Sequence, residues 1–390
     1  MSRIIELQPV DSISNLGNRC VLPHVLLVLD QLPKALGGGE RTAIKLAHLL
    51  PQYGYRASIL TFFAHPESSA LNSPTCPIYL LPLQRTYNFT GLRAALDFAA
   101  FLRERHIQIV QTFFESSDLW AGSVTKAMTD SKLIWSRRDM GILRTHKHRI
   151  AYRLLAGIPD AIFAVSEQVR QHSIGVDEID PERVQTIYNG LNLSDWNGFY
   201  SRAQTVENLH VTTTGNIRRV KGHDVFIRAA AVIRSIYPAV SFSIAGEVLD
   251  PEYYAELQAL VRDLGLSGLF HFLGGVSNLR QHLSSATIFV MPSRSEGFSN
   301  AIIEAMAAWL PVVATDTGGN SEAVRDGFSG ILVPVDDPEA LAAAILRLLR
   351  DPLMATAMGA SGRAIVSECF TDEIMMRHIT SAYAGLLCDR

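Results

Sequence analysis

The chain has 390 residues, of which 48% are hydrophobic and 19% are charged. This length predicts two domains, and this composition is typical of a globular protein with a large core. The formal net charge of -3 argues against nucleic acid as the main partner.

Four cysteines lie far apart in the chain and form no Cys-x-x-Cys pair, which suits a reducing compartment and gives no metal-site pattern. They are Cys20, Cys76, Cys369 and Cys388. The first twenty residues hold no apolar run of signal-peptide length, and no stretch has eighteen uncharged apolar residues. We therefore expect a cytoplasmic protein, or one that lies peripherally on the cytoplasmic membrane face.

The first half begins with a segment that we expect to be irregular, residues 1–22. A short apolar run at 24–32 predicts the first strand, and three glycines at 37–39 separate it from a predicted helix at 40–50. Strand, glycine loop and helix form the geometry in which backbone approaches a phosphate closely. The dinucleotide-binding fingerprint is incomplete because its third glycine position is Thr42. A loop with no ligand remains the alternative.

Short strands and helices then alternate along both halves, which predicts parallel βαβ units in open α/β sheets. In the first half, strands are expected at 56–63, 108–114, 132–137, 161–166 and 184–188, with helices including 92–105 and 146–156. In the second half, strands are expected at 209–214, 240–245, 270–272, 287–291, 311–315 and 330–333. Its helices are expected at 223–235, 251–264, 279–285, 299–309 and 338–350, and a terminal amphipathic helix at 370–387.

A polar, aperiodic segment at 191–207 predicts the domain boundary. We expect an N-terminal domain at 1–200, a C-terminal domain at 201–370 and a terminal helix at 371–390. Glycine turns follow the strands of the second half, and ligands bind at the carboxyl ends of strands in such sheets.

The most informative stretch runs from Thr287 to Glu304. A buried strand ends at Pro292, a polar loop follows, and a helix begins near Ser299, a good N-cap residue. The helix start offers free N–H groups and a positive dipole end to a phosphate. Glu296 and Glu304 flank this cradle as acceptors for hydroxyl groups. A solvated surface helix with two unrelated glutamates is the alternative.

A basic loop at 215–224 follows the first strand of the second half. Arg218, Arg219 and Lys221 are placed to meet an anion beyond that strand end, where they would stabilise a leaving diphosphate. The chain has no Asp-x-Asp pair to hold a diphosphate through Mg²⁺ or Mn²⁺. We therefore expect no metal and no cofactor. A solvated basic loop is the alternative.

Together these motifs resemble the retaining GT-B glycosyltransferases of family 4, also called glycosyl transferases group 1. The resemblance covers most of the chain and is most specific at Glu296 and Glu304 with Gly-Phe-Ser-Asn between them. In the second half it includes Gly215-Asn216-Ile217, Lys221-Gly222, Ala245-Gly246-Glu247, Phe272-Leu273-Gly274, Pro292 to Asn300, Pro311 to Thr315 and Gly318-Gly319. In the first half it includes Gly37 to Arg41, Ser136-Arg137-Arg138, Ala164-Val165-Ser166 and Ile187 to Gly190.

The resemblance implies the GT-B fold, in which two Rossmann-like doubly wound domains face each other across a cleft. It implies that 1–200 is the acceptor-side domain, that 201–370 binds the nucleotide-sugar donor and that the terminal helix at 371–390 crosses back to the first domain. It implies that Glu304 binds a ribose, that Glu296 contacts the donor sugar and that Lys221, with Arg218, neutralises the leaving diphosphate. The other donor-binding residues are expected to be Gly38, Gly39, Gly215, Asn216, Phe298, Ser299 and Asn300.

Two positions depart from the family pattern. Asn216 stands where the family usually has Arg, and Arg218 or Arg219 is a candidate to compensate. The family often has a His just after the strand that ends at Thr112, where this chain has Phe113. We therefore assign no acceptor-side catalytic residue.

The expected function is transfer of a sugar from a nucleotide sugar to a hydroxyl of a saccharide or lipid-linked saccharide, in bacterial polysaccharide or glycolipid assembly. A nucleotide-sugar 2-epimerase and a non-catalytic nucleotide-sugar-binding subunit remain alternatives. The basic segment Arg137 to Arg153 is a candidate for an acceptor phosphate or for peripheral contact with the inner membrane. A solvated basic helix is the alternative there.

Overall fold

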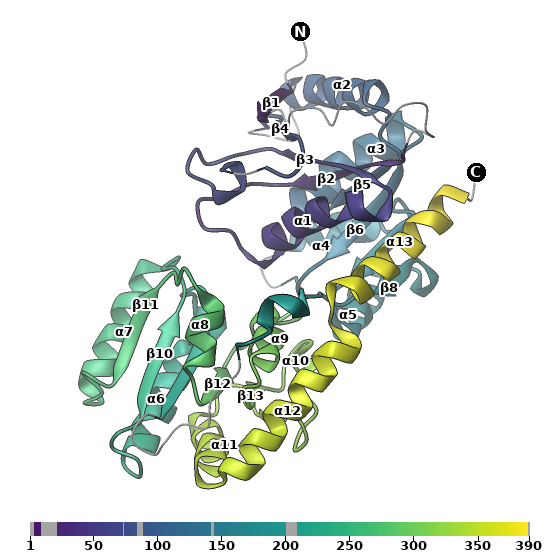
Figure 1. Ribbon diagram of the computed structural model, residues 1–390. Helices are drawn as coiled ribbons and strands as arrows, with labels where there is room; N and C mark the ends of the chain where they lie inside the picture. Colours follow the sequence, from purple (N-terminus) through teal and green to yellow (C-terminus); the bar gives the residue numbers. More distant parts are fainter. Residues whose placement is uncertain are drawn as a thin grey trace. The chain divides into compact units, whose positions relative to one another are not determined.

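The computed structural model describes residues 4–8, 22–72, 74–83, 89–141, 144–199 and 209–388. The chain forms two compact units. Unit 1 contains Met1–Tyr188 and Met375–Arg390, and unit 2 contains Asn189–Ile374. Each unit is a sheet flanked by helices (Figure 1).

The sheet of unit 1 has eight strands in the order β1-β4-β3-β2-β5-β6-β7-β8. They are β1 Ile5–Gln8, β2 His24–Leu29, β3 Arg56–Thr61, β4 Ile78–Leu80, β5 Ile109–Thr112, β6 Lys132–Arg137, β7 Ala161–Ala164 and β8 Val184–Thr186. All pairs are parallel except β1 with β4. The prediction of an irregular segment at 1–22 is therefore wrong at β1, and β4 was also missed. Strands of three or four residues are too short for a periodic pattern, and β1 forms by pairing with β4 at the sheet edge.

The helices of unit 1 surround a core to which the end of the chain contributes. They are α1 Gly38–Leu49, α2 Phe89–Glu104, α3 Gly122–Met128, α4 His146–Leu154, α5 Glu167–Asp177 and, from Met375 onward, α13 Asp372–Cys388. A π-helical turn covers Ser117–Ala121, and 3₁₀ turns cover Leu50–Tyr53, Ser69–Leu71 and Pro181–Arg183. On α13, Tyr383 is fully buried, donates its hydroxyl to Gln111 on β5 and meets the Tyr55 ring edge-on at 5.4 Å between centroids. From Met375 onward, the terminal helix is thus an integral part of unit 1.

Unit 2 has a six-stranded parallel sheet in the order β11-β10-β9-β12-β13-β14. The strands are β9 His210–Thr214, β10 Ser241–Ala245, β11 Phe270–Gly274, β12 Ile288–Met291, β13 Val312–Thr315 and β14 Gly330–Val333. The helices are α6 His223–Arg234, α7 Pro251–Asp263, α8 Leu279–Ser284, α9 Asn300–Ala307, α10 Asn320–Ala323, α11 Pro338–Arg350 and α12 Pro352–Cys369. Two 3₁₀ turns cover Leu193–Trp196 and Arg219–Lys221. Two doubly wound α/β sheets are thus present, which confirms the predicted fold class.

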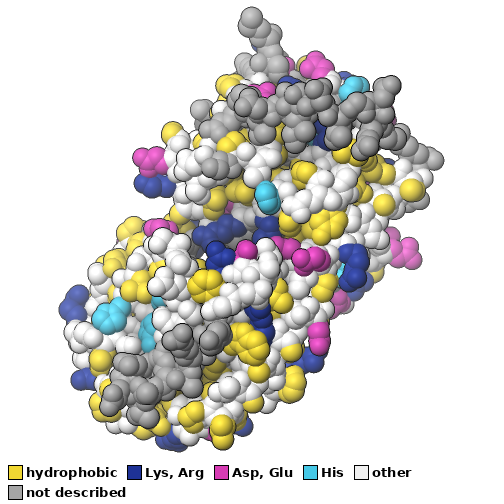
Figure 2. All heavy atoms as spheres, viewed as in Figure 1, with side chains coloured by type: hydrophobic (Ala, Val, Ile, Leu, Met, Phe, Trp, Pro, Cys, Tyr) yellow, Lys and Arg dark blue, Asp and Glu magenta, His cyan; other side chains and the backbone are white. Residues whose placement is uncertain are grey.

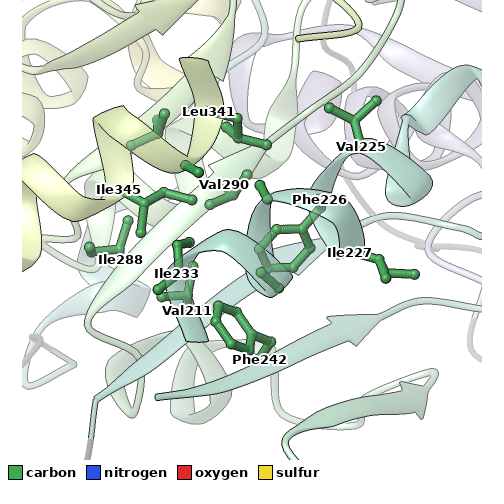
Figure 3. Packing of buried hydrophobic residues seen from close by; sticks show 14 of the residues in the cluster. Val211, Val225, Phe226, Ile227, Ile233, Phe242, Ile288, Val290, Leu341 and Ile345 are labelled. Carbon is green, nitrogen blue, oxygen red and sulfur yellow. The ribbon is translucent and has the colours of Figure 1, made fainter. Parts of the chain in front are cut away.

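The core of unit 2 lies between the sheet and a pair of helices. Figure 3 shows Phe226 of α6 and Ile345 of α11 packed toward Phe242 of β10 and Val290 of β12. All four side chains are fully buried. This packing fixes the strands from which the loops at their carboxyl ends emerge.

The first unit ends earlier in the chain than the predicted boundary at residue 200. After Tyr188, Leu191 pairs with Thr371, and a Cβ at Gly190 would lie 2.4 Å from the Thr371 carbonyl oxygen. The chain from Asn189 therefore packs against the junction of α12 and α13, inside unit 2. The first turn of α13, through Ile374, also belongs to unit 2.

The surface carries charges of both signs. On the face seen in Figure 2, Lys and Arg side chains occur in small groups beside Asp and Glu. Among the described residues, no helix is both long enough and apolar enough to cross a membrane.

Candidate functional site

Two stretches of the sequence reach the same edge of the unit 2 sheet. Strands β9 and β12 are parallel neighbours, with Ile288 opposite Val211 and Phe289 opposite Thr212. The loop after β9 carries the predicted basic residues, and the loop after β12 carries the predicted glutamate and leads into α9. The sheet topology therefore brings both loops to the carboxyl edge, where open α/β sheets bind ligands.

An ion pair joins these two loops. Lys221 Nζ lies 2.6 Å from Glu296 Oε1, and the Ser293 hydroxyl donates to the same oxygen at 2.7 Å. The Glu296 side chain is only 10% exposed, and that of Lys221 is 27% exposed. Because partial burial weakens screening by water, the pair holds both side chains more firmly than a surface ion pair would.

Close backbone packing reinforces this arrangement. Gly222 has φ +62°, and a Cβ there would lie 2.1 Å from the Pro292 carbonyl oxygen. Gly318 has φ +54°, and its Cβ would lie 1.6 Å from the Glu296 carbonyl oxygen. Only glycine combines this backbone conformation with so close an approach. The Glu296 loop is thus enclosed between the turns after β9 and β13.

The start of α9 has the features expected of an anion cradle. The Ser299 hydroxyl caps the helix by accepting from Ile302 N at 3.4 Å. The N–H groups of a first helical turn have no partner within the helix, and a helix start of this kind can bind an anion. Asn189 Nδ2 donates to Asn300 Oδ1 at 2.6 Å, a contact that the sequence did not predict. The Phe298 ring is buried against Phe370. Glu304 lies half-buried one turn further along the helix.

The remaining residues of the predicted basic loop have different surroundings. Arg218 is exposed at the start of the 3₁₀ turn, whereas Arg219 pairs with Glu256 of α7 through two hydrogen bonds. Asn216 Oδ1 accepts from Glu247 N at 3.2 Å and so joins the turns after β9 and β10. The same two turns also pack closely through their glycines. A Cβ at Gly246 would lie 2.0 Å from the carbonyl oxygen of Gly215.

Sequence reasoning gave no role to Arg294 and Asp224. Arg294 Nη1 and Nη2 donate to the two Asp224 oxygens at 3.0 and 2.8 Å, across 70 residues of sequence. Burial tends to raise the pKa of Asp224, but hydrogen bonds from Arg294 and Tyr253 outweigh it and lower the pKa. His223 is also buried, and burial followed by the positive charge of Lys221 lowers its pKa to about 3, so that it is neutral.

In unit 1, the predicted glycines form the first turn of α1. A Cβ at Gly39 would lie 2.7 Å from the tip of the Phe114 ring, whereas Gly38 faces open space. Arg138 Nη2 donates to Thr42 Oγ1 at 2.9 Å, and that hydroxyl donates to the Gly38 carbonyl at 2.9 Å. Burial lowers the pKa of Arg138 to about 10, so it stays charged at neutral pH. Arg138 belongs to the motif Ser136-Arg137-Arg138 that resembles the family. Nothing in the sequence indicated that its side chain would contact α1.

The basic segment 137–153 does not form a single basic surface. Arg137 and Arg144 are buried, with side chains 2% and 6% exposed. Arg137 pairs with Asp118 at 2.9 Å and Arg144 with Asp177 at 2.8 Å. Burial, partly offset by Arg137, raises the pKa of Asp118 to about 6. A buried charge needs a partner of opposite sign. Asp118 of the π-helical turn and Asp177 of α5 are these partners, so the two arginine side chains can be buried.

Metal-binding side chains do not gather among the residues that the structure describes in either unit. Within the described ranges, no three His, Cys, Asp or Glu side chains cluster closely enough to hold a metal ion.

Comparison with protein families gives two matches that follow the two units. The family model "Glycosyltransferase Family 4" matches residues 36–195, and "Glycosyl transferases group 1" matches residues 208–351. The chain belongs to glycosyltransferase family 4. The first matched range includes the predicted glycines Gly38 and Gly39 of unit 1, and the second includes Lys221, Glu296 and Glu304 of unit 2.

Curated relatives carry glycosyltransferase names. The chain is 30% identical over 223 residues to D-inositol 3-phosphate glycosyltransferase of Thermobifida fusca, covering 53% of this chain and 51% of that protein. It is 32% identical over 177 residues to the lipopolysaccharide core biosynthesis mannosyltransferase LpsB of Rhizobium meliloti, covering 44% of this chain and 50% of that protein. The chain thus matches about half the length of these relatives.

Solved structures match nearly the whole chain. Anabaena Alr3699/HepE in complex with UDP and glucose superposes with a TM-score of 0.80 at 22% identity, covering 92% of this chain and 99% of that chain. Sucrose-phosphate synthase of Thermosynechococcus elongatus gives 0.80 at 22% identity, covering 94% and 100%. These similarities establish that this family 4 member has the GT-B fold.

The contact between Gly222 and Pro292 gives a matched pair of substitutions. Gly222→Ala adds left-handed strain and a Cβ clash, whereas Gly327→Ala adds the same strain at φ +70° with nothing within 4 Å. We expect about 1–2 kcal/mol of destabilisation for Gly327→Ala and about 1–3 kcal/mol more for Gly222→Ala. Urea unfolding of both variants measures this difference. Equal losses would contradict the close packing of the two loops.

Proposed function

We propose that this chain transfers a sugar from a nucleoside-diphosphate sugar to an acceptor hydroxyl with retention of anomeric configuration. The observation that carries the proposal is the placement of the Lys221–Glu296 pair and the start of α9 at one sheet edge. The names of the curated relatives support the reaction class. The UDP and glucose bound to Anabaena Alr3699/HepE support the donor class.

The diphosphate is assigned to the start of α9 and to Lys221. Backbone N–H groups of Phe298 to Asn300 and the positive end of the helix dipole would hold the phosphate oxygens. The Lys221 ammonium would stabilise the negative charge that grows on the diphosphate as the bond to the sugar breaks. The exposed Arg218 would add long-range attraction. These groups replace a metal ion in the proposed reaction, which needs no cofactor.

The two glutamates are assigned to the two ends of the donor. Glu304, half-buried one turn inside α9, would accept hydrogen bonds from the ribose hydroxyls. Glu296 receives Lys221 and Ser293 on Oε1, so Oε2 is assigned to the hydroxyls of the sugar. This carboxylate would then position the sugar while its partner Lys221 neutralises the leaving group.

The acceptor proton requires a base. Phe113 occupies the position after β5 where the family often has His, and this buried apolar side chain accepts no proton. We assign the proton to an oxygen of the departing diphosphate, which lies on the same face of the sugar as the incoming hydroxyl when configuration is retained.

Donor binding is tested by thermal shift with UDP, GDP and their glucose and mannose conjugates. A ligand at 100 times its Kd stabilises the folded state by about 2.7 kcal/mol, so the melting temperature should rise with the correct nucleotide. Glu304→Ala should abolish most of this shift, whereas Glu339→Ala, an exposed glutamate on α11, should preserve it. A full shift in Glu304→Ala would contradict the ribose assignment.

The same samples separate the alternative functions. Incubation with donor, saccharide and lipid-linked acceptors, in the presence of EDTA, should release nucleoside diphosphate and form a glycoside with the anomeric configuration of the donor. Conversion of the donor without an acceptor would favour a 2-epimerase. Binding without any release would favour a non-catalytic subunit, and an inverted product would contradict retention.

We further propose peripheral membrane contact through α4 of unit 1. Lys147 and Arg149 are exposed on this helix beside Ile150 and Leu154, which are 47% and 79% exposed. Basic and apolar side chains on one exposed helix suit an anionic lipid surface. The wild-type protein should sediment with vesicles that contain anionic lipid. The double variant Lys147→Glu/Arg149→Glu should sediment with them less. Equal sedimentation of the wild type and the double variant would contradict the proposal.

A further inference from the structure

Arg294, in the loop after β12, makes polar contacts with several segments of unit 2. Besides its two hydrogen bonds to Asp224, Nη1 donates to the Arg219 carbonyl at 2.6 Å, and Nε lies 2.7 Å from Asp336 Oδ1. Its backbone N–H donates to the Val220 carbonyl at 2.8 Å. One residue of the β12 loop thus contacts three successive parts of the chain after β9 and a fourth after β14.

These contacts lie on both sides of Lys221. The Arg219 and Val220 carbonyls precede it, and Asp224 follows it in the first turn of α6. On the other loop, Glu296 is two residues beyond Arg294. The guanidinium therefore fixes the backbone that carries Lys221 to the backbone that carries Glu296, while the two side chains meet at 2.6 Å.

The geometry of this contact is that of a strong, directional link. The guanidinium and the Asp224 carboxylate meet in a two-bond, fork-to-fork arrangement, which restricts orientation as well as distance. Both side chains are about two-thirds buried, with exposures of 31% and 27%. Tyr253 also donates to Asp224 and limits the movement of that carboxylate.

We propose that Arg294, held by Asp224, is a positioning residue that sets the separation of Lys221 and Glu296 for donor binding and transfer. The inference rests on the proposed function of this site. Arg294 contacts neither donor nor acceptor in this account, and it acts through the backbone of the two loops. A displacement of reacting groups by about 1 Å costs up to about 100-fold in rate, so a clamp of this kind affects catalysis.

Arg280 of α8 provides a control elsewhere in unit 2. Its Nη1 donates to the Asp195 carbonyl at 3.0 Å and lies 3.6 Å from Asp195 Oδ2, and its guanidinium lies over the Phe199 ring at 5.7 Å. These contacts join α8 to the 3₁₀ turn Leu193–Trp196, but they do not involve the loops that carry Lys221 and Glu296. Arg280→Met therefore removes an arginine–carboxylate pair without releasing the link between the two loops.

The test measures the affinity for UDP and GDP by calorimetry and the rate of donor turnover. Arg294→Met and Asp224→Asn should each weaken binding of the nucleotide that the wild-type protein binds by about ten-fold, and should lower kcat more than they raise KM. Arg294→Lys, which keeps the charge but loses the fork, should recover only part of the loss. Arg280→Met should bind the same nucleotide within two-fold of the wild-type affinity.

Coupling to Lys221 distinguishes positioning from a general effect on folding. If Arg294 acts through Lys221, then Arg294→Met should weaken nucleotide binding by less than two-fold in a Lys221→Met background. A loss in the double variant equal to the product of the two single losses would overturn the proposal. So would wild-type affinity in Arg294→Met or in Asp224→Asn.

Folding and the proposed function are checked separately. Melting temperatures of all variants show whether unit 2 is intact, and Arg294→Lys carries the test if Arg294→Met does not fold. A wild-type protein that binds neither UDP nor GDP would overturn the proposed function. Normal wild-type binding with no coupling between Arg294 and Lys221 would overturn only the positioning role.

Discussion

The structure of the site depends on one constraint, the contact between the loops that follow two neighbouring parallel strands. The loops after β9 and β12 meet at the Lys221–Glu296 pair and at Gly222, where a side chain would collide with Pro292. This contact places an ammonium group and a carboxylate at the edge from which α9 starts. Without it, the same residues would be a solvated basic loop and a surface glutamate, as the sequence alone allowed.

In the proposed function, groups of different chemistry bind different parts of a sugar nucleotide. A helix N-terminus and one lysine would bind the negatively charged diphosphate, and carboxylates would bind the hydroxyls at either end. Unit 1 uses charge differently. Arg137 is fully buried between Asp118 and the Tyr152 ring, 3.9 Å from the ring centroid. The charge of Arg137 is paired inside the protein and does not reach the surface. The number of arginines in a segment therefore does not predict how basic its surface is.

The sequence predicted most of this fold because the strands of unit 2 are apolar, β-branched and followed by glycine turns. β14 and α11 agree at both ends with their expected ranges. Short edge strands such as β1 were missed because they form through pairing. The Glu296 and Glu304 motif of the site could be predicted because it lies in one continuous stretch of sequence. The contact between Arg294 and Asp224 could not be predicted, because it joins residues 70 apart and forms only when β9 and β12 become neighbours.

The central claim is that the start of α9 and Lys221 together hold the diphosphate of a sugar nucleotide. A crystal structure of the protein with the nucleoside diphosphate that it binds tests this most directly. The account predicts diphosphate oxygens within hydrogen-bond distance of the backbone N–H groups at 298–300 and of Lys221 Nζ, with the ribose hydroxyls on Glu304. A diphosphate bound elsewhere, or a ribose directed away from Glu304, would contradict it.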